Sequence, residues 1–375
     1  MRRLFTPLIS LIFLFSCSEE EKKLERPSEP ITSTTYKAKM DSVLNAKVKE
    51  DEPGIVVLVA FDGEVLFAEG FGMRNVEKGE KLTPTSNMRM ASVSKQFTAL
   101  CMLTLVNEGK ISLDDEASDY LPYPIFEGIK VEQLLNHTSG LPDYYRYFED
   151  KKEEFEVIEN QDVLDWLATG PEPVFPPGEG WEYSNTAYLM AALIVEKVSG
   201  QEFSAYAKEN VFKPSGMAST NYFNLASPVD IPERSLCYQK NPLGSFAAGD
   251  GFFMNGVMGD GAVYTSAKDY FRYDQTLRNK ALLSEELHDF IFQPSSEYEE
   301  DGEKEQYGMG WGVSENSASH TGGWIGTNTY TKRFLDKPLT IALFANRDDF
   351  FEMGLIGQTE KLTLWYLEDQ NLISN

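Results

Sequence analysis

The order of its strand and helix signals constrains the fold of this chain more than any other feature. Strand-like runs occur only near the two ends of the chain, at Gly54–Ala60, Glu64–Phe71, Gly308–Ser314, Asn328–Phe334 and Leu339–Asn346. The first two are joined by the tight turn Phe61-Asp62-Gly63, and the last is followed by a helical segment, Phe350–Asp369. Residues of roughly 113–257 show mostly helical periodicity. The pattern predicts one sheet assembled from both chain ends, an inserted helical region, and a site in the cleft between them.

The first twenty residues have the composition of an export signal. Met1-Arg2-Arg3 precedes an apolar run from Leu4 to Phe15, which is too short to span a membrane. The run ends at Leu14-Phe15-Ser16-Cys17, which resembles the bacterial lipobox. We therefore expect a signal peptide over residues 1–16, a lipidated Cys17, a flexible tether over residues 17–36, and an envelope protein held to a membrane by its lipid. A plain cleaved signal with an incidental cysteine is the alternative.

The charge of the chain argues against some partners. It has 59 acidic and 34 basic side chains, a formal net charge of −25 at pH 7. Such a surface repels nucleic-acid phosphates and anionic lipids, so no nucleic-acid partner is expected. Cys101 and Cys237 could pair in an exported protein, but Cys101 lies in an apolar helical stretch where a buried thiol is commoner. The rest of the chain, residues 37–369, is expected to be one domain and a monomer.

Ser92-Val93-Ser94-Lys95 begins a helix predicted over Ser92–Glu108. Residues three apart share a face of a helix, so the Lys95 amine can reach the Ser92 hydroxyl. A serine needs a neighbouring base to act as a nucleophile, and a lysine serves only where burial or a helix N-terminus lowers its pKa. Backbone N–H groups at the same helix end can stabilise an oxyanion. The pattern predicts Ser92 as nucleophile and Lys95 as its activating partner.

Tyr183-Ser184-Asn185 lies about 90 residues further on, after a Pro-Pro-Gly approach and before an apolar helix. A tyrosine beside an ammonium group can hold a lowered pKa and act as a general base. The Asn185 amide can hydrogen-bond both a lysine and a substrate carbonyl. A second Tyr-x-Asn occurs at Tyr222-Phe223-Asn224, but the first has the more rigid flanks, and we expect it to serve the site.

His320-Thr321-Gly322-Gly323 precedes the last predicted strands. Small residues let a substrate lie close to the backbone, and the Gly323 N–H could complete an oxyanion hole with that of Ser92. His320 could supply a proton or a positive charge near neutral pH. The three histidines, His137, His288 and His320, lack the spacing of a metal site, and His137 is interpreted as structural. No metal or organic cofactor is expected.

These three motifs, in this order, resemble those of the class C β-lactamase and D-alanyl-D-alanine carboxypeptidase-like serine hydrolases. Other stretches are similar to the same family, namely Leu134–Pro142, Gly259–Ser266 and Tyr307–Gly312. The resemblance covers about residues 36–367. It implies an α+β, β-lactamase/transpeptidase-like fold with an antiparallel sheet flanked by helices, the sheet part over about 37–110 and 259–369 and the helical part over about 111–258.

The resemblance also implies roles for the site residues. Ser92 would be acylated, Lys95 would accept its proton or stabilise it, Tyr183 would be the base in acylation and deacylation, and Asn185, His320, Thr321 and Gly323 would bind substrate. One departure is His320, since the family's antibiotic-hydrolysing and cell-wall enzymes usually have a lysine there, whose charge helps to hold a substrate carboxylate. We therefore expect an exported hydrolase of an ester, amide or D-amino-acid peptide rather than an efficient β-lactamase. The alternative is a catalytically idle receptor for cell-wall fragments.

Overall fold

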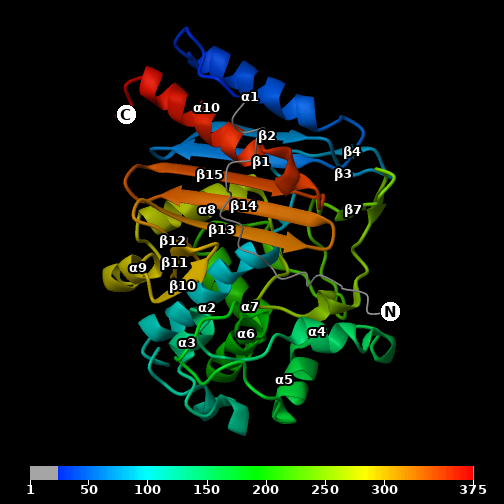
Figure 1. Ribbon diagram of the computed structural model, residues 1–375, viewed down its shortest axis with the longest axis vertical. Coiled ribbons are helices and arrows are strands. Elements are labelled where there is room, and N and C mark those ends of the chain that lie inside the picture. The colour runs from blue at the N-terminus through cyan, green and yellow to red at the C-terminus, as the bar shows by residue number, and fades with distance from the viewer. Residues whose placement is uncertain (1–23, 375) are drawn as a thin grey trace.

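The computed structural model describes residues 24–374, so the predicted signal peptide and the lipid-bearing Cys17 lie outside the described residues (Figure 1). The helices are α1 Ser33–Lys47, α2 Lys95–Asn107, α3 Val131–Leu135, α4 Tyr144–Glu149, α5 Asn160–Ala168, α6 Asn185–Ser199, α7 Phe203–Ala207, α8 Ala267–Arg278, α9 Glu285–Ile291 and α10 Leu355–Asp369. The strands are β1 Ile55–Phe61, β2 Glu64–Phe71, β3 Met73–Asn75, β4 Glu80–Lys81, β5 Met88–Arg89, β6 Asn221–Tyr222, β7 Tyr238–Lys240, β8 Phe246–Ala248, β9 Val263–Thr265, β10 Ser296–Glu300, β11 Glu303–Tyr307, β12 Gly312–Val313, β13 Ser317–Trp324, β14 Thr327–Phe334 and β15 Leu339–Ala345.

One antiparallel sheet is built from the two ends of the chain. Its eight strands lie in the order β10-β11-β12-β13-β14-β15-β1-β2. The N-terminal hairpin joins the C-terminal strands through β1 and β15, where Ile55 pairs with Ala345 and Phe61 with Leu339. The mainly helical region lies below this sheet in Figure 1, with α2 between the two parts. The predicted α+β fold, with its sheet assembled from both termini, is confirmed.

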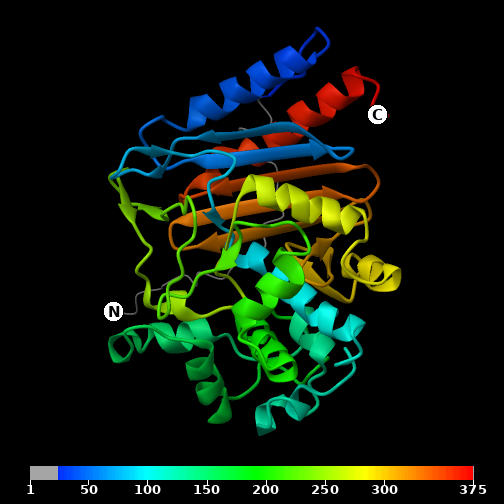
Figure 2. The same ribbon diagram turned by 180° about the vertical axis from the view of Figure 1, so that it is seen from behind.

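The sheet is covered on both faces, which explains why β1 is apolar throughout and why β15 has a single polar residue, Thr340. Val56 and Leu58 of β1 face a core that contains α2, α6 and α8. Ile55, Val57 and Val59 face the opposite core, formed with α1 and α10. Figures 1 and 2 show α1 and α10 on one side of the sheet and α8 on the other. Successive strand residues alternate between faces, so a strand buried on both faces favours apolar residues. The buried Thr340 is the exception in β15, and its hydroxyl donates to the Asp274 carboxylate at 2.8 Å.

Part of the segment expected to be a tether packs against the folded domain. Ile31 is 1% exposed, and its backbone N–H donates to the Asp369 carboxylate. Thr32 caps α1, and Tyr36 stacks on Tyr366 of α10 at 4.5 Å between ring centroids. The prediction of a flexible tether through residue 36 is therefore wrong from about Ile31 onward, because this segment is buried against the closing helix.

Some predicted boundaries also differ from the structure. Gly308–Ser314 contains only the short strand β12, because residues 308–311 form a loop that packs on α2. His320–Gly323 does not precede the strands but lies within β13. The closing helix is interrupted at Gly354, whose backbone is left-handed (φ 67°), so a short helical turn, Phe350–Met353, precedes α10.

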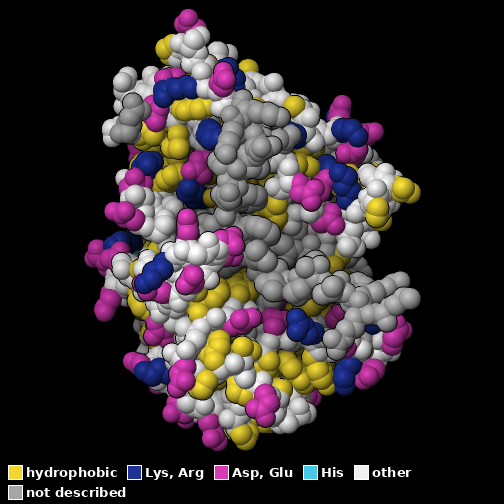
Figure 3. Space-filling model, viewed as in Figure 1, with side chains coloured by type: hydrophobic (Ala, Val, Ile, Leu, Met, Phe, Trp, Pro, Cys, Tyr) yellow, Lys and Arg dark blue, Asp and Glu magenta, His cyan; other side chains and the backbone are white. Residues whose placement is uncertain are grey.

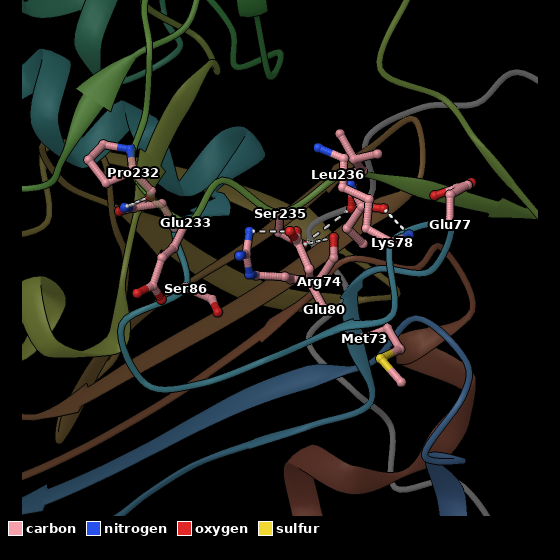
Figure 4. Close-up of polar contacts among 12 residues, drawn as sticks. Met73, Arg74, Glu77, Lys78, Glu80, Ser86, Pro232, Glu233, Ser235 and Leu236 are labelled. Carbon is pink, nitrogen blue, oxygen red and sulfur yellow. Dashed lines mark hydrogen bonds and ion pairs between the residues drawn. The ribbon is translucent and has the colours of Figure 1, made fainter.

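Backbone contacts tie the inserted region to the loop that follows the first hairpin (Figure 4). The carbonyl of Arg74 accepts hydrogen bonds from the Ser235 hydroxyl and the Leu236 N–H. Asn87 donates its side-chain amide to the Pro232 carbonyl and its backbone N–H to the Glu233 carbonyl. Immediately after Asn87, β5 pairs with β9. These contacts fix the start of β5, and with it the approach to Ser92.

The surface agrees with the acidic composition. Figure 3 shows Asp and Glu side chains spread over the face in view rather than gathered in one patch, while hydrophobic side chains gather over the lower, helical part. Cys101 and Cys237 are both buried and free. Between residues 24 and 374, no helix has the length and apolar character that crossing a membrane requires.

Candidate active site

Ser92 lies in a tight turn that leads into α2. The turn Ala91–Ser94 is a 3₁₀ helix, and Ala91 has a left-handed backbone (φ 46°), which is unusual for a residue with a side chain. Three residues make one turn of a 3₁₀ helix, so positions i and i+3 are aligned. The Lys95 Nζ lies 3.3 Å from the Ser92 Oγ. The predicted approach of Lys95 to Ser92 is present in the structure, although through a 3₁₀ turn rather than the first turn of α2.

Lys95 is fully buried, and burial lowers the pKa of its amine to about 8, although the negative charges of Asp260 and Asp143 oppose the shift. Its Nζ donates to the Asn185 Oδ1 at 2.8 Å and to the Asp260 carbonyl at 3.0 Å. An ordinary lysine is almost wholly charged at neutral pH. A lysine with this pKa is neutral often enough to accept a proton from the serine beside it.

Tyr183 lies beside the same amine, but its pKa is not lowered as expected. Its ring faces Lys95, with 4.8 Å between Nζ and the ring centroid. The pKa of its hydroxyl is raised well above the usual value because the group is buried, although the nearby Ser92 hydroxyl acts in the opposite direction. Among residues 24–374 the Tyr183 hydroxyl has no hydrogen-bond partner of ordinary geometry. Tyr183 is therefore protonated at neutral pH, and the expected lowering of its pKa is wrong.

Asn185 is held by a residue that the sequence reading missed. Asp143 accepts hydrogen bonds on its Oδ2 from both the backbone N–H and the side-chain amide of Asn185, each at 3.1 Å. Since the amide nitrogen is held by Asp143, the Asn185 Oδ1 faces Lys95. Asp143 caps α4 and directly follows Leu134–Pro142, so its position next to a family-like stretch was the signal available.

His320 lies under the site rather than open to it. It is 2% exposed, and its Nδ1 lies 2.5 Å from the Thr321 carbonyl, which can only accept, so Nδ1 carries the proton. Its Nε2 then accepts the Tyr307 hydroxyl at 2.9 Å. Burial lowers the pKa of His320 to about 3. Of the two roles considered for His320, a positive charge near neutral pH is therefore wrong, whereas a neutral ring agrees with the expectation of poor carboxylate binding. Both ring nitrogens have partners in the protein.

β13 presses against the turn that carries Ser92. A methyl group at Gly322 would overlap the Met90 carbonyl and the Thr329 hydroxyl, so only glycine fits there. The next residue, Gly323, lines a pocket together with Ser92 and Asn185, and its role as a second oxyanion donor stays a prediction. Thr321 is half-buried on β13 opposite Tyr330 and is not among the residues that line this pocket.

His137 is buried behind Tyr183 in the position of a structural residue. Its Nδ1 accepts the Ser184 N–H at 3.1 Å, and its ring packs 4.3 Å from that of Tyr183. This contact holds the Tyr183–Asn185 segment at the start of α6. No three His, Cys, Asp or Glu side chains within residues 24–374 converge closely enough to share a metal ion. The site is thus made of a serine, a buried amine, a protonated phenol and an amide.

The family model described as Beta-lactamase matches residues 36–359. Penicillin-binding protein 4* of Bacillus subtilis is 33% identical over 82% of this chain and 71% of its own length. The crystal structure of a penicillin-binding protein from Bacillus halodurans, 25% identical, superposes with a TM-score of 0.76 over 86% of this chain and 98% of that one. The D-amino acid amidase of Ochrobactrum anthropi, 21% identical, shares the fold with a TM-score of 0.71 over 90% and 98% of the two chains.

Proposed function

Since the chain belongs to the beta-lactamase family of serine hydrolases, we propose that it hydrolyses an ester, amide or D-amino-acid peptide bond through an acyl-enzyme on Ser92. The observation that carries this proposal is the contact between the Ser92 hydroxyl and the Lys95 amine, 3.3 Å apart, with the pKa of Lys95 lowered to about 8. A catalytically idle receptor would have no need for a buried lysine whose pKa is lowered in this way.

In the acylation step, the neutral Lys95 amine takes the proton from the Ser92 hydroxyl as its oxygen attacks the substrate carbonyl. The carbonyl oxygen becomes an oxyanion, held by the backbone N–H groups of Ser92 and Gly323. Asn185 positions the substrate amide while its own carbonyl stays on Lys95. Lys95 is preferred over Tyr183 as the base because the phenol already holds its proton at neutral pH.

The tetrahedral intermediate then collapses, and the bond to the leaving group breaks. The leaving nitrogen or oxygen takes a proton from the Tyr183 hydroxyl, which regains one from the protonated Lys95. Water next attacks the acyl-enzyme and gives up its proton to the same pair, which releases the acid and restores the Ser92 hydroxyl. All protons in the cycle pass among Ser92, Lys95 and Tyr183.

The nucleophile is tested by treating the protein with p-nitrophenyl acetate and following both p-nitrophenolate release and the mass of the Ser92 peptide. Ser92→Ala should lose both turnover and the acetyl adduct. The matched variant Ser94→Ala changes the other serine of the motif and should retain the adduct. Turnover by Ser92→Ala at the wild-type rate would exclude the proposed nucleophile.

The roles of Lys95 and Tyr183 are separated by comparing an ester with an amide. Lys95→Met should abolish acylation by both p-nitrophenyl acetate and a D-alanine p-nitroanilide. Tyr183→Phe should slow the anilide far more than the ester, because a p-nitrophenolate leaves without a proton whereas an anilide does not. Equal losses on both substrates would instead identify Tyr183 as the acylation base.

We further propose that esters and D-peptides are better substrates than β-lactams. A neutral, buried His320 offers no cation at the position where the family's antibiotic-hydrolysing enzymes usually have lysine. The relative from Bacillus subtilis is named for binding penicillin, so the proposed preference concerns turnover and not binding. Turnover of esters, D-peptides and a cephalosporin should be compared directly, and a kcat/KM highest for the cephalosporin would overturn this preference.

The location of the protein is proposed from its first residues. We propose that it is exported and held to a membrane of the cell envelope by lipid on Cys17. In the native bacterium or a host with lipoprotein processing, Cys17→Ser should move the protein from the membrane fraction to the soluble envelope fraction. Retention of the Cys17→Ser protein in the membrane fraction would contradict the anchor.

A further inference from the structure

Arg89 lies in the wall of the active-site pocket. It ends β5, three residues before Ser92, and it lines the same pocket as Ser92, Gly323 and Trp324. The side chain is buried, with 5% of the residue exposed, and its guanidinium lies 6.0 Å from the centroid of the Trp324 indole. A permanent cation therefore borders the position of the reacting carbonyl.

Within residues 24–374 this guanidinium has no hydrogen bond or ion pair, and its Nε is buried and unpaired. Its neighbours include the Trp324 ring and, at longer range, the charge of Asp260. The two other arginines that are buried between residues 24 and 374 contrast with it. Arg333 pairs with Asp274 at 2.5 Å, and Arg347 pairs with Asp349 at 2.8 Å. Arg89 thus lacks the acidic partner that other buried arginines of this chain possess.

A buried, unpaired guanidinium is costly unless something supplies the missing charge. Asp260 lines the same pocket but makes no ion pair with Arg89 within the described residues; its Oδ2 accepts the Tyr144 hydroxyl at 3.1 Å, and Lys95 is its principal charged neighbour. The planar fork of an arginine matches a carboxylate with two parallel hydrogen bonds. The missing partner is therefore best supplied by a carboxylate on the substrate.

The position of the pocket indicates which end of the substrate it receives. The leaving amine of an amide or peptide must take up a proton, so it departs on the side of Tyr183. Tyr183 does not line the pocket that contains Arg89, whereas Ser92, Asn185 and Gly323 do. The pocket therefore lies on the side of Ser92 where the acyl group remains after the leaving group has gone.

We propose that Arg89 binds a carboxylate carried by the acyl portion of the substrate, so that the acyl group on Ser92 ends in an anion paired with this arginine. The proposal rests on the acyl-enzyme function proposed above. It names the substrate class as esters, amides or peptides whose acyl part has a free carboxylate. In this complex the half-buried indole of Trp324, which lies beside Arg89, would pack against the carbon chain of the acyl group, between its carboxylate and the carbonyl that is attached to Ser92.

The test uses two esters with the same leaving group and the same number of acyl carbons, p-nitrophenyl hydrogen glutarate and p-nitrophenyl valerate. The rate with Ser92→Ala is subtracted from each, because the free carboxylate speeds spontaneous hydrolysis. Wild-type kcat/KM should favour the glutarate by roughly tenfold to hundredfold, the range for a hydrogen-bonded charged pair. The succinate and adipate homologues locate the best chain length.

Two variants decide whether Arg89 causes the preference. Arg89→Gln should bring the glutarate-to-valerate ratio close to one, and Arg89→Lys should restore part of it. The ratio cancels any loss of folded protein, since both esters report on the same molecules. The matched control is Arg74→Gln, since Arg74 already pairs with Glu80 at 3.1 Å outside the pocket (Figure 4), and it should keep the wild-type ratio.

The outcomes separate this proposal from the function it rests on. A wild-type ratio near one, or a ratio that Arg89→Gln leaves unchanged, overturns the role of Arg89 alone. Ester turnover that survives Ser92→Ala overturns the acyl-enzyme instead. Glutarate should also raise the melting temperature of the wild type but not of Arg89→Gln, with neutral glutaramide as control. Absence of this shift in the wild type overturns the pairing even if no ester is hydrolysed.

Discussion

The contact between β13 and the serine turn can be tested by one added methyl group. In Gly322→Ala the new Cβ overlaps the Met90 carbonyl and the Thr329 hydroxyl. Ordinary contacts between such atoms lie near 3.5 Å, so β13 must retreat by roughly 1 Å from the turn. Overpacking of this kind costs about 1–3 kcal/mol of unfolding free energy. A shift of about 1 Å between reacting groups also costs on the order of a hundredfold in rate.

Both effects are measurable in the same preparation. Urea unfolding followed by tryptophan fluorescence reports the stability, and stopped-flow acylation by p-nitrophenyl acetate reports the placement of the oxyanion donor. Gly323→Ala is the matched stability control, because its Cβ would meet only the Asn328 amide nitrogen at 3.6 Å, an ordinary contact. A Gly322→Ala protein with wild-type stability and acylation rate would show that β13 is not pressed against the Ser92 turn.

Four more predictions follow from the same geometry. Acylation should rise about tenfold from pH 7 to pH 9, because a Lys95 with a pKa of about 8 goes from roughly one-tenth to nine-tenths neutral; a flat stopped-flow profile would contradict Lys95 as the base. Asp143→Asn should lower kcat/KM and move the midpoint of that profile to lower pH, since the Asp143 charge raises the pKa of Lys95, whereas a purely structural loss would leave the midpoint unchanged. His320→Asn should reduce the acid sensitivity of the fold: the native pKa of about 3 lies below the unfolded value, so protons bind the unfolded chain more tightly and stability is lost as the pH falls from about 6.5 toward 3. An undiminished slope in urea melts at several pH values would exclude this contribution. Ile31→Ala should cost about 2–5 kcal/mol in unfolding free energy, and no measurable change would restore the flexible tether.

The sequence predicted the sheet and the main catalytic contact because both follow from local patterns. Apolar runs at the two ends of the chain specify buried strands, and the spacing of Ser92 and Lys95 brings an amine to a hydroxyl whether the turn is α or 3₁₀. The contact between Lys95 and Asn185 joins two segments that are distant in the sequence, and only the order of the family-like motifs indicated that they belong to one site. A helix at Ser33–Lys47 was missed, although Tyr36, Met40 and Leu44 recur at the spacing of one helix face.

The protonation states could not be predicted, because they depend on packing between distant segments. His320 of β13 loses its charge through burial against Tyr307, and Tyr183 keeps its proton through burial beside Lys95. A motif gives the type of a residue but not the solvent around it, and desolvation decides the direction of these shifts. Arg89 was overlooked for the same reason, since a missing partner is visible only when all neighbours have been placed.

The pairing of β1 with β15 has a consequence for how the molecule acquires its shape. Ile55 meets Ala345, so the N-terminal hairpin stays an unprotected edge until β15 has been made. Because the two strands are so far apart in the sequence, we expect the sheet to close slowly and late in folding. Premature termination before β15 would leave the β1–β2 hairpin without its neighbour. Such late pairing would suit the export proposed above, because little of the native sheet can form in a chain that is translocated before β15 meets β1.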